Sequence, residues 1–265
     1  MLIQSSLKTV HLAAKEQMTY RLAMFSGWMT NLFWGIFRYY LLVAIYGSRT
    51  DINGLTDAAA TTYVPLAQSL LAFLNIFGVS QISQTIYSGQ VGMQLLKPQG
   101  FFRYWLSYYF GKSLVNFVLR GILLFVIFAA FFPVIVPQTA LQWLLFCISL
   151  LVSWFVSHLW IITVNLSAIW SKDAAGILRM VYALQMLLAG MLFPIRLFPV
   201  WFQKVCYLTP FPAMMNVPME IFTGTLGIQE SIALILQQFM WCGVLALLGQ
   251  IVLRVGLRKL TLEGG

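Results

Sequence analysis

Six long apolar runs set the main constraint on how this chain folds. A bilayer core about 30 Å thick is crossed by roughly 20 residues of helix, and backbone groups inside it must be hydrogen-bonded within their own segment. Each run is therefore predicted to be a membrane-spanning helix. The predicted spans are residues 22–46, 63–86, 110–132, 139–165, 177–193 and 231–253.

The composition agrees with a membrane protein and argues against other classes. Of the 265 residues, 60% are hydrophobic and 9% are charged, whereas about a quarter of an ordinary soluble domain is charged. The chain begins with polar and basic residues instead of a short apolar core, so no cleaved signal peptide is predicted. The net charge of +9 comes from cations scattered between apolar runs, so we expect no nucleic-acid partner.

The positions of the basic residues predict the orientation. Eleven of the 16 lie in the N-terminal segment, in the loops 87–112 and 166–179, and in the C-terminal tail. Loops rich in lysine and arginine stay on the cytoplasmic side of a membrane. The expected fold is therefore an all-α, polytopic membrane protein with six transmembrane helices and both termini cytoplasmic, forming a single domain over residues 1–265.

The N-terminal segment, residues 1–21, is predicted to be an amphipathic helix. Ile3, Leu7, Val10, Ala14 and Met18 recur at steps of three and four, which places them on one helical face. Such a helix can lie along the cytoplasmic membrane surface. The alternative, a short helix that packs against the bundle, stays open.

Two segments face the outer side. Residues 47–62 are short and polar, and are predicted to be a connector. Residues 194–230 contain five of the nine prolines among many Phe, Trp and Met residues. Helix breaks at membrane depth survive only when protein or water covers them. This second segment is therefore predicted to form short re-entrant helices.

Polar residues inside the predicted spans are candidates for a pathway. An arginine near mid-bilayer costs about 2.5 to 3.5 kcal/mol on the most lenient scale, so Arg38 and Arg120 each need water or a partner. Arg38 can snorkel outward and Arg120 inward, or one of them faces a polar pathway or a second subunit. Asn31, Gln68 and Asn75 are expected to face protein or a pathway, because lipid does not accept their amides.

The loop 87–109 is the most distinctive cytoplasmic segment. It combines the apolar pair Leu95-Leu96, a Lys97-Pro98 turn and four aromatic rings between residues 101 and 105. Such a loop is either an interfacial anchor or a docking element whose leucine and aromatic side chains enter a groove in a soluble partner.

Catalytic and metal sites find no support in the sequence. The seven acidic residues are dispersed, His158 is alone in an apolar run, and the three cysteines are far apart. "FGKS" at residues 110–113 is not a phosphate-binding loop, because Leu106 stands where that motif needs a glycine. The chain is therefore not expected to be an enzyme or to bind a metal.

Three stretches carry a resemblance to a known family. They are "GQVGMQLLKPQGFFRYW" (89–105), "LFPIRLFPVWFQKVCYLTPFPAMMNVPMEIFTG" (192–224) and the basic tail "RVGLRKLTLEGG" (254–265). Together they resemble the permease subunits of type-2 ABC exporters, in particular the six-span bacterial branch with paired permeases and a separate ATPase.

The resemblance implies a transport mechanism. Two permeases, identical or paired with a sister chain, would stand side by side in the bacterial plasma (inner) membrane above two copies of a cytoplasmic ABC ATPase. ATP and Mg would bind to the ATPase, and no cofactor to this chain. The implied coupling residues in the loop 87–109 are Met93, Gln94, Leu95, Leu96, Lys97, Pro98 and Phe101.

The same resemblance assigns roles to two further groups. The implied pathway or dimer-interface residues are Asn31, Arg38, Gln68, Asn75 and Gln185. The implied outer lid lies in residues 194–230 and includes Pro194, Pro210, Pro218 and Glu220. The alternative function is a non-transporting membrane scaffold or assembly factor, which would use the loop 87–109 only to dock a cytoplasmic partner.

Overall fold

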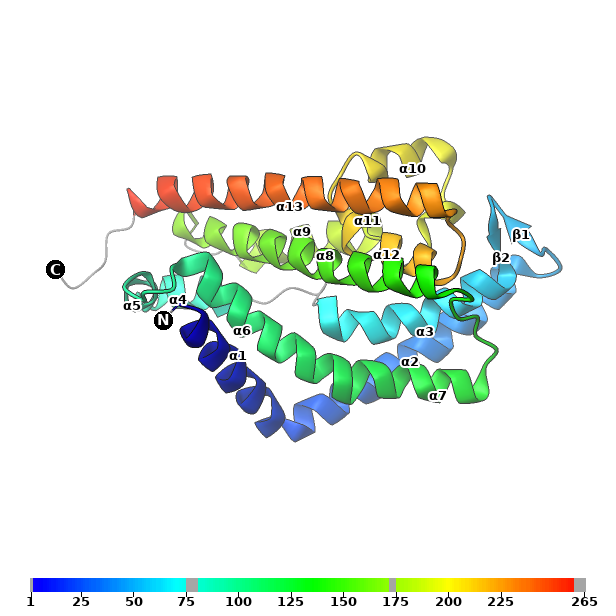
Figure 1. Cartoon of the computed structure of the whole chain (residues 1–265), viewed down its shortest axis with the longest axis horizontal. Coiled ribbons are helices and arrows are strands. Elements are labelled where there is room, and N and C mark those ends of the chain that lie inside the picture. Colours follow the sequence, from blue (N-terminus) through cyan, green and yellow to red (C-terminus); the bar gives the residue numbers. More distant parts are fainter. Residues whose placement is uncertain (1, 75–80, 172–174, 260–265) are drawn as a thin grey trace.

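The computed structural model describes residues 2–74, 81–171 and 175–259 (Figure 1). Its long elements are α1 (Leu2–Thr19), α2 (Arg21–Tyr46), α3 (Asp57–Leu74), α8 (Ala140–Asn165), α13 (Ile228–Leu257), and a continuous helix made of α6 (Phe101–Asn116), the π-helical η1 (Phe117–Ile122) and α7 (Leu123–Phe131). The shorter elements are α4 (Gln81–Tyr87), α5 (Val91–Leu95), η2 (Leu166–Ile169), α9 (Ala175–Leu188), η3 (Ile195–Leu197), α10 (Val200–Tyr207), α11 (Phe211–Met214) and α12 (Asn216–Phe222). A small hairpin pairs β1 (Asp51–Ile52) with β2 (Leu55–Thr56).

The two ends of the bundle differ in what they carry. The start of α1 and the end of α13 lie at the same end as α4 and α5, on the left of Figure 1. The β1–β2 hairpin and α10 lie at the opposite end. We call these the α5 end and the hairpin end.

The predicted all-α membrane fold is confirmed in its class. Among the described residues, three helices are long and apolar enough to cross a membrane: Phe101–Phe131, Ala140–Ile169 and Ile228–Leu257. The other three predicted spans correspond to α2, to α3 with α4, and to α9. The count of six spans stays a prediction.

Two helix starts differ most from the prediction. α3 begins at Asp57 instead of residue 63, because Thr56 caps it by accepting a hydrogen bond from the Ala59 amide at 3.2 Å. α6 begins at Phe101 instead of residue 110. The rings of Phe101, Trp105 and Tyr109 recur every four residues and are at most 5% exposed, so they form one buried helical face instead of a loop.

The core of the bundle is built on α8, against which α13, α12, α6 and α3 all pack. Ser149, Ser153 and Ser157 form a fully buried stripe of small residues on α8, and such stripes allow close helix approach in membranes. Gln238 of α13 donates to Ser153 Oγ at 2.8 Å and to the Ala213 carbonyl at 2.9 Å. These bonds tie α13, α8 and α11 together.

α1 packs along α6 and still presents an apolar face. Thr9 and Ala13 are buried, and Gln17 donates to Asn116 at 2.9 Å. Ile3 and Leu7 of the predicted stripe remain 77% and 63% exposed. One face of the helix thus packs on the bundle, as the alternative interpretation expects, and its position along a membrane surface stays a prediction.

Glycine at position 111 sets the distance between α1 and α6. A Cβ there would overlap the carbonyl oxygen of Val10, which is backbone and has no room to move. Gly111→Val is therefore expected to push α1 off α6, with a loss of up to about 3 kcal/mol. Thermal unfolding and the rate of tryptic cleavage after Lys8 and Lys15 would measure this.

Gly243→Val is the matched control, because a Cβ on Gly243 meets nothing within 4 Å. The control is expected to keep the parental unfolding midpoint and resistance to trypsin. Identical behaviour of the two variants would contradict the proposed close contact.

Candidate functional site

One cavity brings together three of the polar residues singled out by sequence. Its volume is about 290 Å³, and it lies between the middle of α2, α3 and the residues around the end of α9. The lining residues are Thr30, Asn31, Trp34, Arg38, Gln68, Met186, Met191 and Leu192. Asn31, Gly35, Arg38 and Leu42 form the buried face of α2 at helical spacing, which explains why residues distant in sequence meet there. We call this the Arg38 cavity.

Arg38 is the charged group of this cavity. Its side chain is buried, with 7% of the residue exposed, so the outward-snorkelling interpretation is wrong. Nη2 donates a hydrogen bond to the Leu192 carbonyl, while Nε is buried without a hydrogen-bond partner among the described residues. Between described residues, the ion pairs are Lys112–Glu16 and Arg196–Glu220, and neither includes Arg38.

The predicted amide residues divide into three cases. Asn31 donates to the Gln68 carbonyl at 3.3 Å, and Gln68 is 3% exposed beside Gly35. Gln185 is fully buried, with neither amide atom bonded within the described part of the chain, and it is not among the residues that line the Arg38 cavity. Asn75 lies outside the described residues.

Arg120 occupies a different environment. It lies in η1, where the helix widens, and its Nη2 donates to the Gly27 carbonyl of α2 at 2.9 Å. The adjoining cavity, of about 270 Å³, is otherwise lined by Met24, Phe25, Trp28, Leu119 and Leu123. Arg120 is thus hydrogen-bonded to the backbone of α2 among apolar side chains.

The α5 end presents two exposed apolar side chains. Val91 is buried and Leu95 packs against the core, whereas Met93 and Leu96 are 66% and 86% exposed. Leu96 and Met93 together are called the α5 surface. Phe101, another of the implied coupling residues, lies in the core at 5% exposure.

The rest of the predicted coupling segment surrounds this surface. Lys97 Nζ lies 3.5 Å from the centroid of the Tyr104 ring, a cation–π contact that holds the turn. Pro98 is exposed, and Gln94 is half-buried. The segment is thus a short helix and turn fixed on the bundle, with its two most exposed apolar side chains pointing away from the core.

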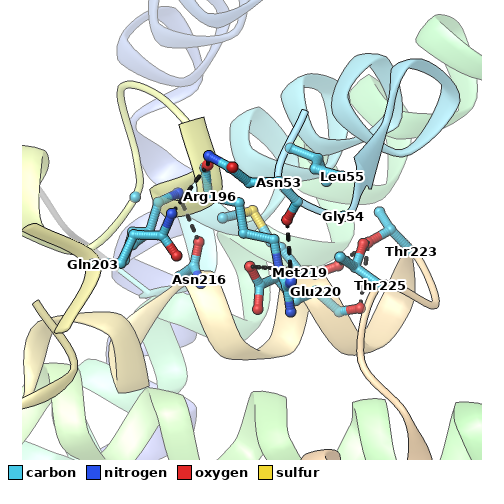
Figure 2. Close-up of polar contacts among 12 residues, drawn as sticks. Asn53, Gly54, Leu55, Arg196, Gln203, Asn216, Met219, Glu220, Thr223 and Thr225 are labelled. Carbon is cyan, nitrogen blue, oxygen red and sulfur yellow. Dashed lines mark hydrogen bonds and ion pairs between the residues drawn. The ribbon is translucent and has the colours of Figure 1, made fainter. Parts of the chain in front are cut away.

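At the hairpin end, buried polar residues form a network that the sequence did not reveal (Figure 2). Arg196 Nε pairs with Glu220 Oε1 at 2.9 Å, and the Glu220 side chain is fully buried while that of Arg196 is 22% exposed. Tyr207 donates to Glu220 Oε2 at 3.2 Å. Asn53 of the hairpin donates to the Arg196 carbonyl at 2.9 Å.

Asn216 extends this network into the bundle. Its Nδ2 donates to the Tyr207 hydroxyl at 3.0 Å, and its Oδ1 lies 2.8 Å from the Tyr63 hydroxyl of α3. Tyr63 also approaches the Gly190 carbonyl at 2.9 Å. Gly190 has φ +75°, and a Cβ there would lie 2.6 Å from the Tyr63 hydroxyl, so this position requires glycine. Asn53, Tyr63, Arg196, Tyr207, Asn216 and Glu220 are called the outer network.

Burial dominates the electrostatics of the outer network. It raises the pKa of Glu220 above the ordinary value, and the Arg196 cation acts in the opposite direction. Burial and the neighbouring Glu220 raise the pKa of the Tyr207 phenol, so Tyr207 stays a neutral donor. The predicted lid residues Pro194, Pro210 and Pro218 are all buried around this network.

Sequence signals for the outer network were present but ambiguous. Arg196 and Glu220 are opposite charges in an otherwise apolar segment, and Asn53-Gly54 is a typical two-residue hairpin turn with positive φ at both positions. Among the described residues, no group of three His, Cys, Asp or Glu side chains is placed to hold a metal. The interactions of the outer network are polar contacts and packing.

A comparison with models of protein families identifies the family of this chain. The family model described as ABC-2 family transporter protein matches residues 32–264, which include the Arg38 cavity except Thr30 and Asn31, the α5 surface and the outer network. No curated protein matches this chain.

Proposed function

The chain belongs to the ABC-2 transporter family, and we propose that it is the permease subunit of an exporter that pairs with a second permease. Permeases of this family are transport subunits that work in a lipid bilayer with a cytoplasmic ABC ATPase. The second permease is either another copy of this chain or a sister chain. Two ATPase copies carry the ATP and Mg, and the assembly lies in a bacterial plasma membrane.

The observation that carries the coupling proposal is the α5 surface. Leu96 and Met93 are strongly exposed on a short helix that is fixed to the bundle by Val91 and Leu95. Exposed apolar anchors on a rigid element are suited to a groove in a soluble partner. Closure of the ATPases would move α5 and, through the hydrophobic core that contains both Val91 and Phe101, the long helix that begins at α6.

Orientation is proposed from charge. The α5 end carries Lys97, and Arg254 in the last turn of α13 and Arg258 just after it lie there. Cationic ends stay in the cytoplasm, which places the α5 surface where an ATPase can reach it. The hairpin end then faces outward.

The pathway is proposed to run along α2, α3 and α9. These helices surround the Arg38 cavity, and α2 also exposes Phe33, Trp34 and Phe37 at 50 to 66%. A second permease placed against α2 would enclose the cavity between the two chains. On the outward side of the cavity, the outer network would hold together the short helices α10, α11 and α12, which would form a re-entrant lid.

Affinity purification of the full chain from its native membrane in mild detergent, followed by mass spectrometry, tests this proposal. An ABC ATPase is expected among the retained proteins, and a second six-span chain would identify a heteromeric permease pair. Recovery of the chain without any ATPase, under conditions that preserve a known ABC complex, would contradict the transport role and favour a membrane scaffold.

A further inference from the structure

The Arg38 cavity has an unusual chemical composition. It contains one cationic side chain, three neutral polar side chains (Thr30, Asn31 and Gln68), and an apolar remainder formed by Trp34, Met186, Met191 and Leu192. No carboxylate stands among the residues that line it in the described part of the chain. The cavity therefore combines a single cation and neutral polar groups with an apolar lining.

The guanidinium of Arg38 has N–H donors that the protein does not pair. It has five N–H donors, of which the hydrogen bond to Leu192 O engages one group, while Nε is buried without a partner among the described residues. A buried cation needs a counter-charge or water. The described ion pairs leave Arg38 out, so an anion that entered the cavity would meet a cation without a counter-charge.

We propose that the Arg38 cavity binds the anionic head group of an amphipathic molecule. A carboxylate, phosphate or sulfate accepts hydrogen bonds from the Arg38 guanidinium, with Asn31 and Gln68 beside it to complete its coordination. The apolar part of the molecule packs on Met186 and Met191, whose flexible side chains adapt to different shapes. This inference rests on the proposed function, because it names the substrate class of the transport pathway.

The size and the position of the cavity fit a head group with part of a chain. About 290 Å³ lies at the lower end of the range for small-molecule sites, roughly 300 to 1,000 Å³. The remainder of a longer tail would lie along Trp34 and the neighbouring Phe33 and Phe37, which are exposed on α2. An apolar tail in contact with this surface stays out of water.

Arg120 provides an internal comparison. It is also an arginine within a predicted span, its Nη2 bonds to Gly27 O, and its Nε likewise lacks a partner among the described residues. Unlike Arg38, it has no amide or hydroxyl side chain among the residues that line its cavity. A general attraction between membrane arginines and anions would involve both positions. A specific binding site for a head group would involve Arg38 and not Arg120.

Binding of radiolabelled dodecanoate to the full chain, purified in a neutral maltoside detergent with any subunits that co-purify, tests the proposal. Arg38→Gln is expected to weaken binding at least about tenfold, and Arg38→Lys to retain part of it because the charge remains. Arg120→Gln is expected to bind as the parent does. Thermal unfolding of each variant establishes that it is folded, and Trp34→Ala, at a half-exposed position, gives a second loss of affinity if Arg38→Gln unfolds.

Competition separates the possible sources of the head group. Unlabelled dodecanoate and phosphatidylglycerol are both expected to displace the label, whereas dodecyltrimethylammonium is not. Stronger displacement by phosphatidylglycerol would assign the cavity to a membrane lipid, and stronger displacement by dodecanoate to a free amphiphile. Equal loss in Arg38→Gln and Arg120→Gln, or displacement by the cationic amphiphile, would overturn the proposal. The assay needs no ATPase, so its failure is distinct from failure of the proposed function.

Discussion

Leu96→Asp is expected to weaken binding of the partner ATPase by about thirtyfold or more and to stop transport. Leu96 is 86% exposed at the tip of the α5 surface, and loss of a central apolar anchor typically costs about 2 kcal/mol or more. The aspartate also brings a carboxylate into an apolar groove without a partner, which adds a desolvation cost. Equilibrium binding of the purified ATPase to the immobilised permease would measure the loss.

Leu208→Asp is the matched control for this change. Leu208 is 78% exposed but follows α10 in the outer segment, far along the chain from the α5 surface. The same substitution there is expected to leave ATPase binding intact. Leu95→Asp differs from both, because Leu95 packs against the core and its replacement is expected to destabilise the fold. Undiminished binding by Leu96→Asp would contradict the docking role.

Arg196→Met is expected to destabilise the protein by about 3 kcal/mol. The change leaves the Glu220 carboxylate fully buried without its cation, with neutral donors such as Tyr207 and Asn216 remaining, and breaking a buried pair in this way costs about 3 to 5 kcal/mol. We take the lower value because the Arg196 side chain is 22% exposed. Denaturant unfolding in detergent would give the free energy of unfolding.

Replacing Glu220, the other member of the ion pair, is expected to cost less stability than Arg196→Met. Glu220→Gln keeps an acceptor for Tyr207 and leaves Arg196 partly able to reach water, so a loss of about 1 kcal/mol is expected. Arg49→Met, at an exposed arginine of the hairpin end, is the control and is expected to change stability by less than about 0.5 kcal/mol. A larger loss in Glu220→Gln than in Arg196→Met would show that the buried carboxylate is not held by Arg196.

Hydropathy predicted the long helices well because membrane length and backbone hydrogen bonding leave few alternatives. α2 and α8 each begin within one residue of the predicted start. α6 was misjudged because Phe101, Trp105 and Tyr109 stand among polar residues, so their helical spacing was hidden by low hydropathy. The predicted start at residue 110 followed the apolar run, whereas the helical periodicity of the rings already begins at Phe101.

The candidate site was predictable only in part. Arg38, Asn31 and Gln68 stood out because polar groups in an apolar helix need partners, and the cavity joins them. Their common cavity with Met186 and Leu192 could not be read from sequence, since it depends on how the end of α9 returns to α2. The Arg196–Glu220 pair likewise joins residues 24 positions apart, with the short helices α10 and α11 between them, where no periodic pattern links the two charges.

Site-specific photo-cross-linking in intact membranes tests the central claim most directly. A photo-reactive amino acid is placed at position 96, on the α5 surface, and in a separate variant at position 208, in the outer segment. The account predicts that illumination joins position 96, and not position 208, to a cytoplasmic ABC ATPase. Adducts from position 96 that contain only lipid or other membrane chains, in cells that express the ATPase, would contradict the coupling of this chain to an ATPase through α5.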